Sequence, residues 1–210
     1  MEDAIARLSE DAIQERERWN GSCFGNFLRM QRGMKFSGGV MHRLLFRELH
    51  QDGPTDEMRF MLGNQSVRFS RVEFCLITRL KFGDTYDEVE NGMHQRYFGG
   101  RDVVTFSELE AQIQQGQREQ SFDALKLCLL LMVNCVIHGL DERHSVPTWL
   151  VRLVEDLDAF NVFPWGSYVY KTSIFGFKKA LHKKKNIFNI FGFAYALLVF
   201  AYEVIPTLTT

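Results

Sequence analysis

Two apolar segments constrain the fold of this 210-residue chain more than any other feature. Residues 122–138 and 191–204 are apolar nearly all round when drawn as helices, so neighbouring elements have to cover both. The uncharged run that overlaps the second segment, Ile187 to Tyr202, is shorter than the roughly 20 apolar residues that a membrane-spanning helix needs, and it includes Asn189. We therefore expect a central helix pair shielded by amphipathic helices, rather than a membrane anchor.

The composition is that of a folded globular protein, with 46% hydrophobic residues, 24% charged residues and only 4 prolines. The 4 cysteines lie among apolar neighbours without CxxC spacing, which indicates reduced thiols and no disulfide. The charged N-terminus lacks the apolar core of a secretory signal peptide. We predict a charged helix over residues 1–20, a single globular and mostly helical domain over 21–206, and a tail over 207–210.

The fold class predicted is mainly α, a single helical domain with one small β-hairpin at about residues 57–69. Hydrophobic residues alternate on both sides of Gly63-Asn64-Gln65, as expected of two paired strands and their turn. Ser70 and Glu73 then form a capping box that opens the next helix, and Ser107 with Glu110 is expected to cap another. Helical periodicity, caps and breakers predict further helices over 4–19, 23–30, 40–49, 71–80, 107–116, 147–160 and 167–182.

The net charge of −1 conceals an uneven distribution of charge along the chain. Residues 161–202 contain lysines but no acid, and residues 18–47 contain arginines but no acid. Such asymmetry favours an anionic partner, although a run of charges can also be an ordinary solvated surface or part of a nuclear localisation signal. Residues 84–104 have no stable period and are expected to form a long surface loop that moves or binds.

Metal and nucleophile chemistry find little support in the sequence. Cys135, His138 and His144 are spaced as three possible metal ligands, but no fourth ligand is apparent, and core packing explains the cysteine better. Cys23, in GSCFG, is the one cysteine beside a glycine-flanked helix start, yet a small buried residue is the simpler interpretation. We predict no catalytic residue, no metal site and no cofactor, and we keep a cysteine hydrolase centred on Cys23 only as a third hypothesis.

The acidic residues after Pro147 do not form a catalytic pair. Glu155, Asp156 and Asp158 are one to three positions apart on an expected helix, so neighbouring members point to different sides. A solvated face, or a partner for a helix N-terminal dipole, accounts for them better. The chain is therefore expected not to be an enzyme.

Several segments resemble a plant-specific domain of unknown function. They are, in order, SCFGNFL, MRFMLGNQSVRFSRVEFCLITRLKFG, YFGGRDVVTFSELE, LVEDLDAFNVFPWGSYVY and FGFAYALLVFAYEVIP. The resemblance extends over about residues 20–206 and is most specific at Arg68–Leu80 and Asp156–Tyr168. One departure is Arg79, where the family commonly has glycine in an IT-Gly-Leu form.

The resemblance implies a setting for the protein. The family is found in transposon-derived proteins, often upstream of a SUMO-protease-like cysteine peptidase domain, and in VANC-type anti-silencing proteins of Mutator-like elements. Because this chain lacks the peptidase domain, proteolysis is not expected of it. The resemblance implies a nuclear module that associates with transposon DNA.

Our leading hypothesis is a non-enzymatic nuclear module that binds double-stranded DNA, with chromatin proteins as further partners and with neither a membrane nor a small-molecule substrate. Lysines would contact phosphates and arginines would contact phosphates or bases. The alternative is a protein-interaction or substrate-recruiting domain that serves a SUMO-type peptidase or a chromatin complex through the loop 84–101. The DNA-binding candidates are Lys171, Lys178, Lys179, Lys183, Lys184, Lys185, Arg29, Arg32, Arg43, Arg47, Arg68, Arg71 and Arg79.

Overall fold

The structure, a computed structural model, comprises two compact units that each draw on three segments of the chain. It describes residues 13–29, 36–49, 56–84, 97–101, 103–115, 122–140, 144–181 and 190–205. Unit 1 takes its described residues from Met1–Arg32, Thr85–Val136 and Leu140–Phe163, and unit 2 from Gly33–Asp84, Ile137–Gly139 and Pro164–Thr210. The expectation of one domain over 21–206 stays a prediction, because compactness of each part does not show whether the two fold as one.

The mainly α fold with one small hairpin is confirmed. The helices of unit 1 are α2 (Ile13–Gly21), a 3₁₀ turn (Gly25–Arg29), α6 (Phe106–Gln115), α7 (Asp123–Leu131), α8 (Thr148–Leu153) and α9 (Leu157–Val162). Those of unit 2 are α3 (Gly38–Leu45), α4 (Arg71–Thr78), α10 (Trp165–Leu181) and α11 (Ala194–Val204). The hairpin of unit 2 consists of β1 (Met58–Leu62) and β2 (Gln65–Phe69).

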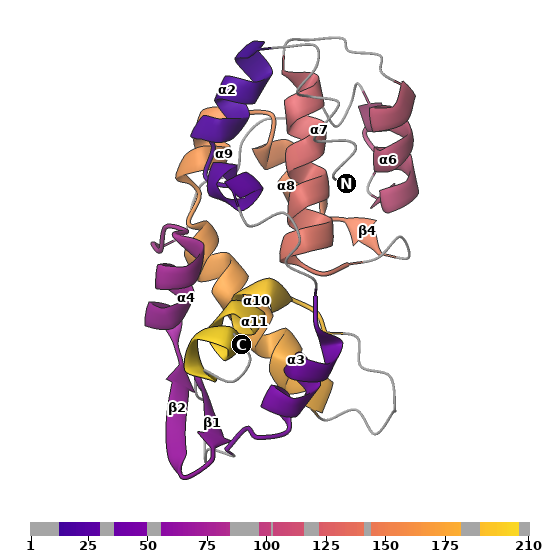
Figure 1. The fold of residues 1–210 in the computed structure, drawn as a ribbon. Helices are drawn as coiled ribbons and strands as arrows, with labels where there is room; N and C mark the ends of the chain where they lie inside the picture. Colours follow the sequence, from indigo (N-terminus) through magenta and orange to yellow (C-terminus); the bar gives the residue numbers. More distant parts are fainter. Residues whose placement is uncertain are drawn as a thin grey trace. The chain divides into compact units, whose positions relative to one another are not determined.

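Helix α7 is the centre of unit 1, where it packs against α6 and α2 (Figure 1). Every one of its residues is buried, including Asp123 and Lys126. The buried charges are paired: the Tyr97 hydroxyl donates to the Asp123 carboxylate at 2.7 Å, and the Lys126 ammonium lies 3.3 Å from Glu155 and 3.8 Å from Asp123. Pairing is what makes charge tolerable in such a core, since an unpaired buried charge is strongly destabilising.

Two aromatic residues of the expected surface loop are part of this core. Tyr97 is 8% exposed and Phe98 is 1% exposed, so the aromatic part of the loop is buried and not available to a partner. The free energy gained by removing two large aromatic rings from water favours their burial, even though the residues that precede them in the sequence are polar. The rest of the loop, residues 85–96, lies outside the described residues.

Three sequence-based details of unit 1 are wrong. The helix expected over 147–160 is two helices, because the Asp156 carboxylate caps α9 by accepting hydrogen bonds from the amides of Asp158 and Ala159. The cap of α6 is Thr105 with Glu108, two residues before the expected pair. A short antiparallel pair, β3 (Val104–Thr105) and β4 (Ser145–Val146), was not expected, and its strands of two residues are too short to give an alternation signal.

The hairpin of unit 2 follows its hydrophobic alternation. Phe60 and Phe69 are buried, whereas Arg59 and Arg68, which are cross-strand partners, point to the other face. Gly63 has φ +59, as the first central residue of a type II′ turn requires. The two-residue turn pins the register, and the register decides which side chains face solvent.

Helix α11 is the centre of unit 2, where it contacts α3, α4 and β2 (Figure 1). Its Phe200 ring lies 5.0 Å from Phe69 and 6.3 Å from Phe60 between centroids, so the hairpin closes over the helix with aromatic contacts. The two apolar helices are thus each the centre of a different unit, and not the single central pair expected. Among the residues that the structure describes, no helix is long and apolar enough to cross a membrane.

The end of the first apolar helix departs from regular α geometry. After α7 the chain continues as a π-helical turn, Met132–Ile137, and Gly139 follows with φ +62. The glycine ends the helix near the position that the sequence predicts, since a left-handed residue there suits glycine. The chain passes from unit 1 to unit 2 within this turn.

Candidate nucleic-acid interface

The three described lysines of the basic C-terminal region lie on one face of α10. At about 100° per residue, Lys171, Lys178 and Lys179 share an arc of about 100° with Phe175, and we call these four residues the α10 stripe. Lys171 and Lys179 are exposed and Lys178 is half-buried. Helix α10 contains no acid, and among the described residues Lys171 and Lys179 form no ion pair. Their charge is therefore available to an anion.

Phe175 is an exposed aromatic ring in the middle of the stripe. Its exposed fraction is 67%, and the Lys179 ammonium lies 5.7 Å from the ring centroid, within cation–π range. The sequence-based candidates do not include it. Helical spacing is the signal that could have found it, because Phe175 falls on the same arc as the lysines, whereas the buried Phe177 falls on the other side of the helix.

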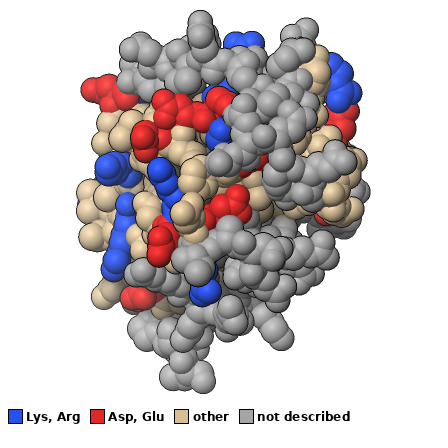
Figure 2. All heavy atoms as spheres, turned by 90° about the horizontal axis from the view of Figure 1, so that it is seen from above, with Lys and Arg blue, Asp and Glu red and all other residues tan. Residues whose placement is uncertain are grey.

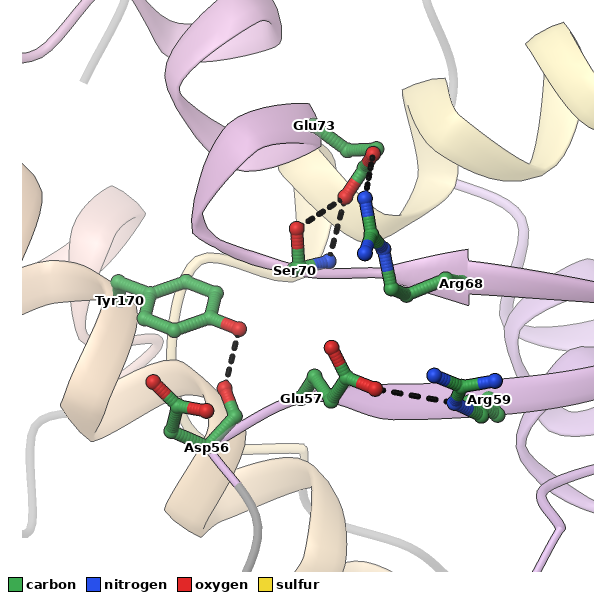
Figure 3. A network of polar contacts seen from close by, with 7 residues as sticks. All are labelled: Asp56, Glu57, Arg59, Arg68, Ser70, Glu73 and Tyr170. Carbon is green, nitrogen blue, oxygen red and sulfur yellow. Dashed lines mark hydrogen bonds and ion pairs between the residues drawn. The ribbon is translucent and has the colours of Figure 1, made fainter.

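Two arginines face each other across the hairpin (Figure 3). Arg59 lies 2.9 Å from Glu57 and Arg68 lies 3.6 Å from Glu73, and both arginine side chains are about half exposed. Like charges directly opposed across a strand pair repel, and the two glutamates offset that repulsion. Arg59 is absent from the sequence-based candidates, although the hairpin register would have placed it opposite Arg68.

The capping box of α4 organises the glutamate beside Arg68. The Ser70 amide and hydroxyl both donate to the Glu73 carboxylate, at 2.7 and 2.5 Å (Figure 3). Partial burial acts to raise the pKa of Glu73, but these hydrogen bonds and the Arg68 guanidinium outweigh it and hold the pKa below its usual value. Glu73 therefore stays ionised and keeps Arg68 partly neutralised, which leaves less charge for an external anion.

The remaining arginine candidates are spread over two helices. The Arg71 guanidinium lies 5.1 Å from the Phe82 ring centroid, Arg79 is the C-cap of α4, and Arg47 on the α3 side donates to the carbonyl of Arg43 at 3.2 Å. Arg71 and Arg79 lie at the two ends of α4, and the chain at Arg47 lies beside β1, where the Met61 amide donates to the Arg47 carbonyl at 2.9 Å. The side chain of Arg29, and Arg32, Lys183, Lys184 and Lys185, lie outside the described residues.

Tyr170 ties α10 to the start of the hairpin. Its hydroxyl donates to the carbonyl of Asp56 (Figure 3). Its ring lies 5.4 Å from the Phe74 ring of α4 between centroids. Burial raises the pKa of Tyr170, and the nearby Asp56 and Glu57 raise it further, so the hydroxyl stays protonated as a donor. The stripe therefore projects from a helix whose opposite face is anchored inside unit 2.

An apolar groove lies at the C-terminal end of α10. Its volume is about 260 Å³, and it is lined by Phe36, His42, Leu45, Phe46, Ala180 and Ile190. Phe46 is 64% exposed and packs against His42 with ring centroids 4.4 Å apart and the ring planes tilted by 51°. The groove is a second surface feature of unit 2, and it is apolar where the stripe is cationic.

Burial favours the neutral forms of Cys135 and His138, two of the residues considered as metal ligands. Burial raises the pKa of the Cys135 thiol to about 12 and lowers that of His138 to about 4, which opposes thiolate chemistry at this pair. The Cys23 thiol is directed at the carbonyl of Phe160, 4.0 Å away. Within the described part of the chain, no three His, Cys, Asp or Glu residues are grouped as metal ligands.

Charges of both signs are mixed elsewhere on the surface. On the face that Figure 2 shows, the described basic side chains are interspersed with acidic ones. Arg18 near Asp158 and Arg101 near Glu108 are ion pairs of this kind, at 3.9 and 2.5 Å. Lys171 and Lys179 of α10 differ from these positions because they form no ion pair among the described residues.

Comparison with protein families gives one match. The family model described as Domain of unknown function (DUF1985) matches residues 45–175. The match contains both of the most specific segments, 68–80 and 156–168, and is narrower than the resemblance over 20–206. No curated protein and no solved structure matches the chain.

Proposed function

From the premise that the chain belongs to the DUF1985 family, whose function is unknown, we propose that it is a non-enzymatic DNA-binding module. The observation that carries the proposal is the α10 stripe: a helix without acids whose exposed face holds Lys171, Lys178 and Lys179. Lysine ammonium groups are suited to phosphate oxygens, and such contacts supply affinity without sequence information.

The arginines have a secondary role in this proposal. Arg59 and Arg68 on the hairpin are held by glutamates, so their contribution to phosphate binding is smaller than that of the stripe. Arg71 and Arg79 of α4 have no acidic partner among the described residues and are the better candidates for base contacts. Specific recognition is thus assigned to α4 and general affinity to α10.

The cellular setting belongs to the same proposal. The resemblance described above supports a plant transposon-derived protein of the anti-silencing type, which acts in the nucleus on double-stranded transposon DNA and alongside chromatin proteins. A module that binds phosphates through one lysine face would anchor such a protein to DNA while other elements choose the site. Chromatin immunoprecipitation from plant nuclei would test this setting, and recovery of no transposon DNA would contradict it.

The test of DNA binding is fluorescence anisotropy of labelled duplexes at several salt concentrations. We expect the logarithm of the binding constant to fall linearly with the logarithm of the salt concentration, with a slope of about −0.9 for each phosphate neutralised. The double variant Lys171→Glu/Lys179→Glu should reduce the magnitude of the slope by about 2 and weaken binding to all sequences alike.

The matched control is Lys81→Glu, which is compared with the single variant Lys171→Glu because each makes the same charge change at one exposed lysine of unit 2, and Lys81 lies outside α10. The control variant should bind almost as the unmodified protein does. Equal losses from Lys81→Glu and from Lys171→Glu would show that only net charge matters, and unchanged binding in the double variant would refute the role of the stripe.

A second candidate function is a protein-interaction or substrate-recruiting domain of a SUMO-type peptidase or chromatin complex. The apolar groove of unit 2 favours it, because an exposed ring such as Phe46 beside a concave apolar surface is typical of a site for a partner side chain. Phe46→Glu should abolish capture of such a peptidase or complex by the purified protein. Capture that persists in this variant would exclude the groove.

A further inference from the structure

The stripe contains an aromatic ring that the binding of duplex phosphates does not need. Lysines are sufficient for phosphates, yet Phe175 stands among them with 67% of its surface exposed. Exposing a large ring to water is unfavourable, and Phe177, also on α10, is fully buried. The cation–π contact with Lys179 covers only part of one ring face.

The chemistry of the stripe selects among nucleic-acid ligands. Its exposed side chains are lysines and a phenylalanine, without the arginine, asparagine or glutamine that reads base edges in a groove. A flat aromatic ring is suited instead to the face of a base, and in a duplex the neighbouring base pairs cover those faces. Proteins that bind single strands use this same combination of cations along the backbone and aromatic rings on which bases stack.

We propose that the α10 stripe binds single-stranded or locally unpaired DNA, with an unpaired base stacked on Phe175 and the flanking phosphates on Lys171 and Lys179. Lys171 and Lys179 are separated by about 12 Å along the helix axis, with Phe175 midway, so cations lie on both sides of the ring. This inference rests on the proposed function, because it specifies which form of DNA the same face prefers. A module of this kind would hold DNA whose strands are already parted.

The test compares three probes of one mixed sequence: a short single strand, its duplex, and the duplex with a central unpaired bubble. Phe175→Ala should weaken binding to the single strand and the bubble by roughly 5- to 150-fold, the range found when stacking aromatics are removed, and leave the perfect duplex unaffected. Phe175→Trp should retain or strengthen single-strand binding. Because residue 175 is exposed, these variants are expected to keep the fold.

Two controls separate stacking from simple hydrophobic contact. Phe175→Leu keeps an apolar side chain but loses the aromatic face, so it should behave as Phe175→Ala does. Phe46→Ala removes an equally exposed phenylalanine outside α10 and should leave binding to all three probes unchanged. Full affinity in the leucine variant, or equal losses from Phe46→Ala, would overturn the assignment of a stacking site to Phe175.

The outcomes also separate this inference from the proposed function. If Lys171→Glu/Lys179→Glu weakens binding to every probe while Phe175→Ala weakens none, the DNA-binding module stands and the single-strand site is wrong. If the unmodified protein binds none of the probes, the proposed function fails as well. Binding to vesicles of anionic phospholipid that depends on Phe175, with no binding to any probe, would assign the stripe to a membrane surface instead.

Discussion

At the scale of single residues, Arg79 ends α4 in a left-handed backbone conformation, with φ 57 and ψ 18. Only glycine adopts this region without a steric cost, which amounts to about 1–2 kcal/mol for other residues. The resemblance described above implies glycine at this position, and the left-handed backbone conformation is a physical reason for glycine there. Arg79 supplies a positive charge at this position, but its left-handed backbone conformation lowers the stability of the folded state.

We predict that Arg79→Gly stabilises the protein by about 0.5 kcal/mol, since relief of the left-handed cost exceeds the extra entropy that glycine brings to the unfolded chain. Urea denaturation measures the change. Arg79→Ala removes the same charge and keeps the strain, so it should give no stabilisation. A gain in stability from Arg79→Ala equal to that from Arg79→Gly would mean that charge, and not backbone, is the cause.

His138 is a second residue with a measurable individual effect. It is 8% exposed, its Nε2 has no hydrogen-bond partner among the described residues, and burial lowers its pKa from 6.5 to about 4. The folded state therefore favours the neutral ring. As the pH falls from about 6.5 to about 4, the unfolded chain binds a proton that the folded chain resists, and stability declines by up to about 3 kcal/mol.

The prediction is checked by urea denaturation between pH 7 and pH 5, where few carboxylates titrate. His138→Gln should be less stable at pH 7, because a buried amide replaces the ring, but should lose less stability on acidification than the unmodified protein. His42→Gln alters an exposed histidine on α3 and should retain the full pH dependence. An unchanged pH dependence in His138→Gln would rule out His138 as its source.

At the scale of elements, glycines set how closely α10 approaches the segment before α11. A Cβ at Gly176 would overlap the backbone carbonyl of Phe191, and one at Gly192 would overlap the Cα of Ser173. The Ser173 hydroxyl accepts a hydrogen bond from the Phe193 amide at 2.8 Å across this contact. The two glycines therefore permit a backbone contact that any larger residue would push apart.

We predict that Gly176→Ala destabilises the protein by about 2 kcal/mol or more, as overpacking against rigid backbone does. Gly39→Ala, in α3, is the matched control because nothing lies within 4 Å of its Cβ position and alanine favours a helix, so a stabilisation of about 0.5 kcal/mol is expected. Thermal unfolding compares the two. Similar stabilities for both variants would contradict the close approach.

At the scale of the whole molecule, both units are discontinuous in sequence. In unit 2, the central helix α11 comes from the C-terminal quarter of the chain and the hairpin comes from its first half. Unit 1 consists of three separate segments of the chain, all of which precede Pro164. Neither unit is a contiguous fragment that truncation would isolate. This connectivity favours unfolding in one cooperative step.

Native-state hydrogen exchange tests that cooperativity. The slowest amides of α7 in unit 1 and of α11 in unit 2 should exchange with the same opening free energy, within about 0.5 kcal/mol, and urea should lower both equally. Differential scanning calorimetry should then show one transition with equal calorimetric and van't Hoff enthalpies. Clearly different free energies for the two helices would establish two independently unfolding domains.

Some features were open to prediction because their signals are local. The Ser70 and Glu73 capping box, the hairpin and the glycine near the end of the first apolar helix each depend on a few neighbouring residues. The break at Asp156 was missed because an aspartate within a helical apolar pattern is compatible both with the N-cap of a new helix and with the exposed face of a continuous one. Tyr97 and Phe98 were expected to be accessible because their burial depends on α7, which is distant in sequence.

The sequence by itself determined the mainly α class, the hairpin with its register, and the placing of lysines without acids on α10, because periodicity, turn chemistry and helix spacing are properties of adjacent residues. Only the tertiary structure decided that the two apolar helices are the centres of separate units. It alone showed how much of the Phe175 ring is exposed, and it showed Arg68 held by Glu73 while Lys171 is free of ion pairs among the described residues. Exposure and charge pairing depend on which distant segments pack together, and short-range patterns carry no record of that packing.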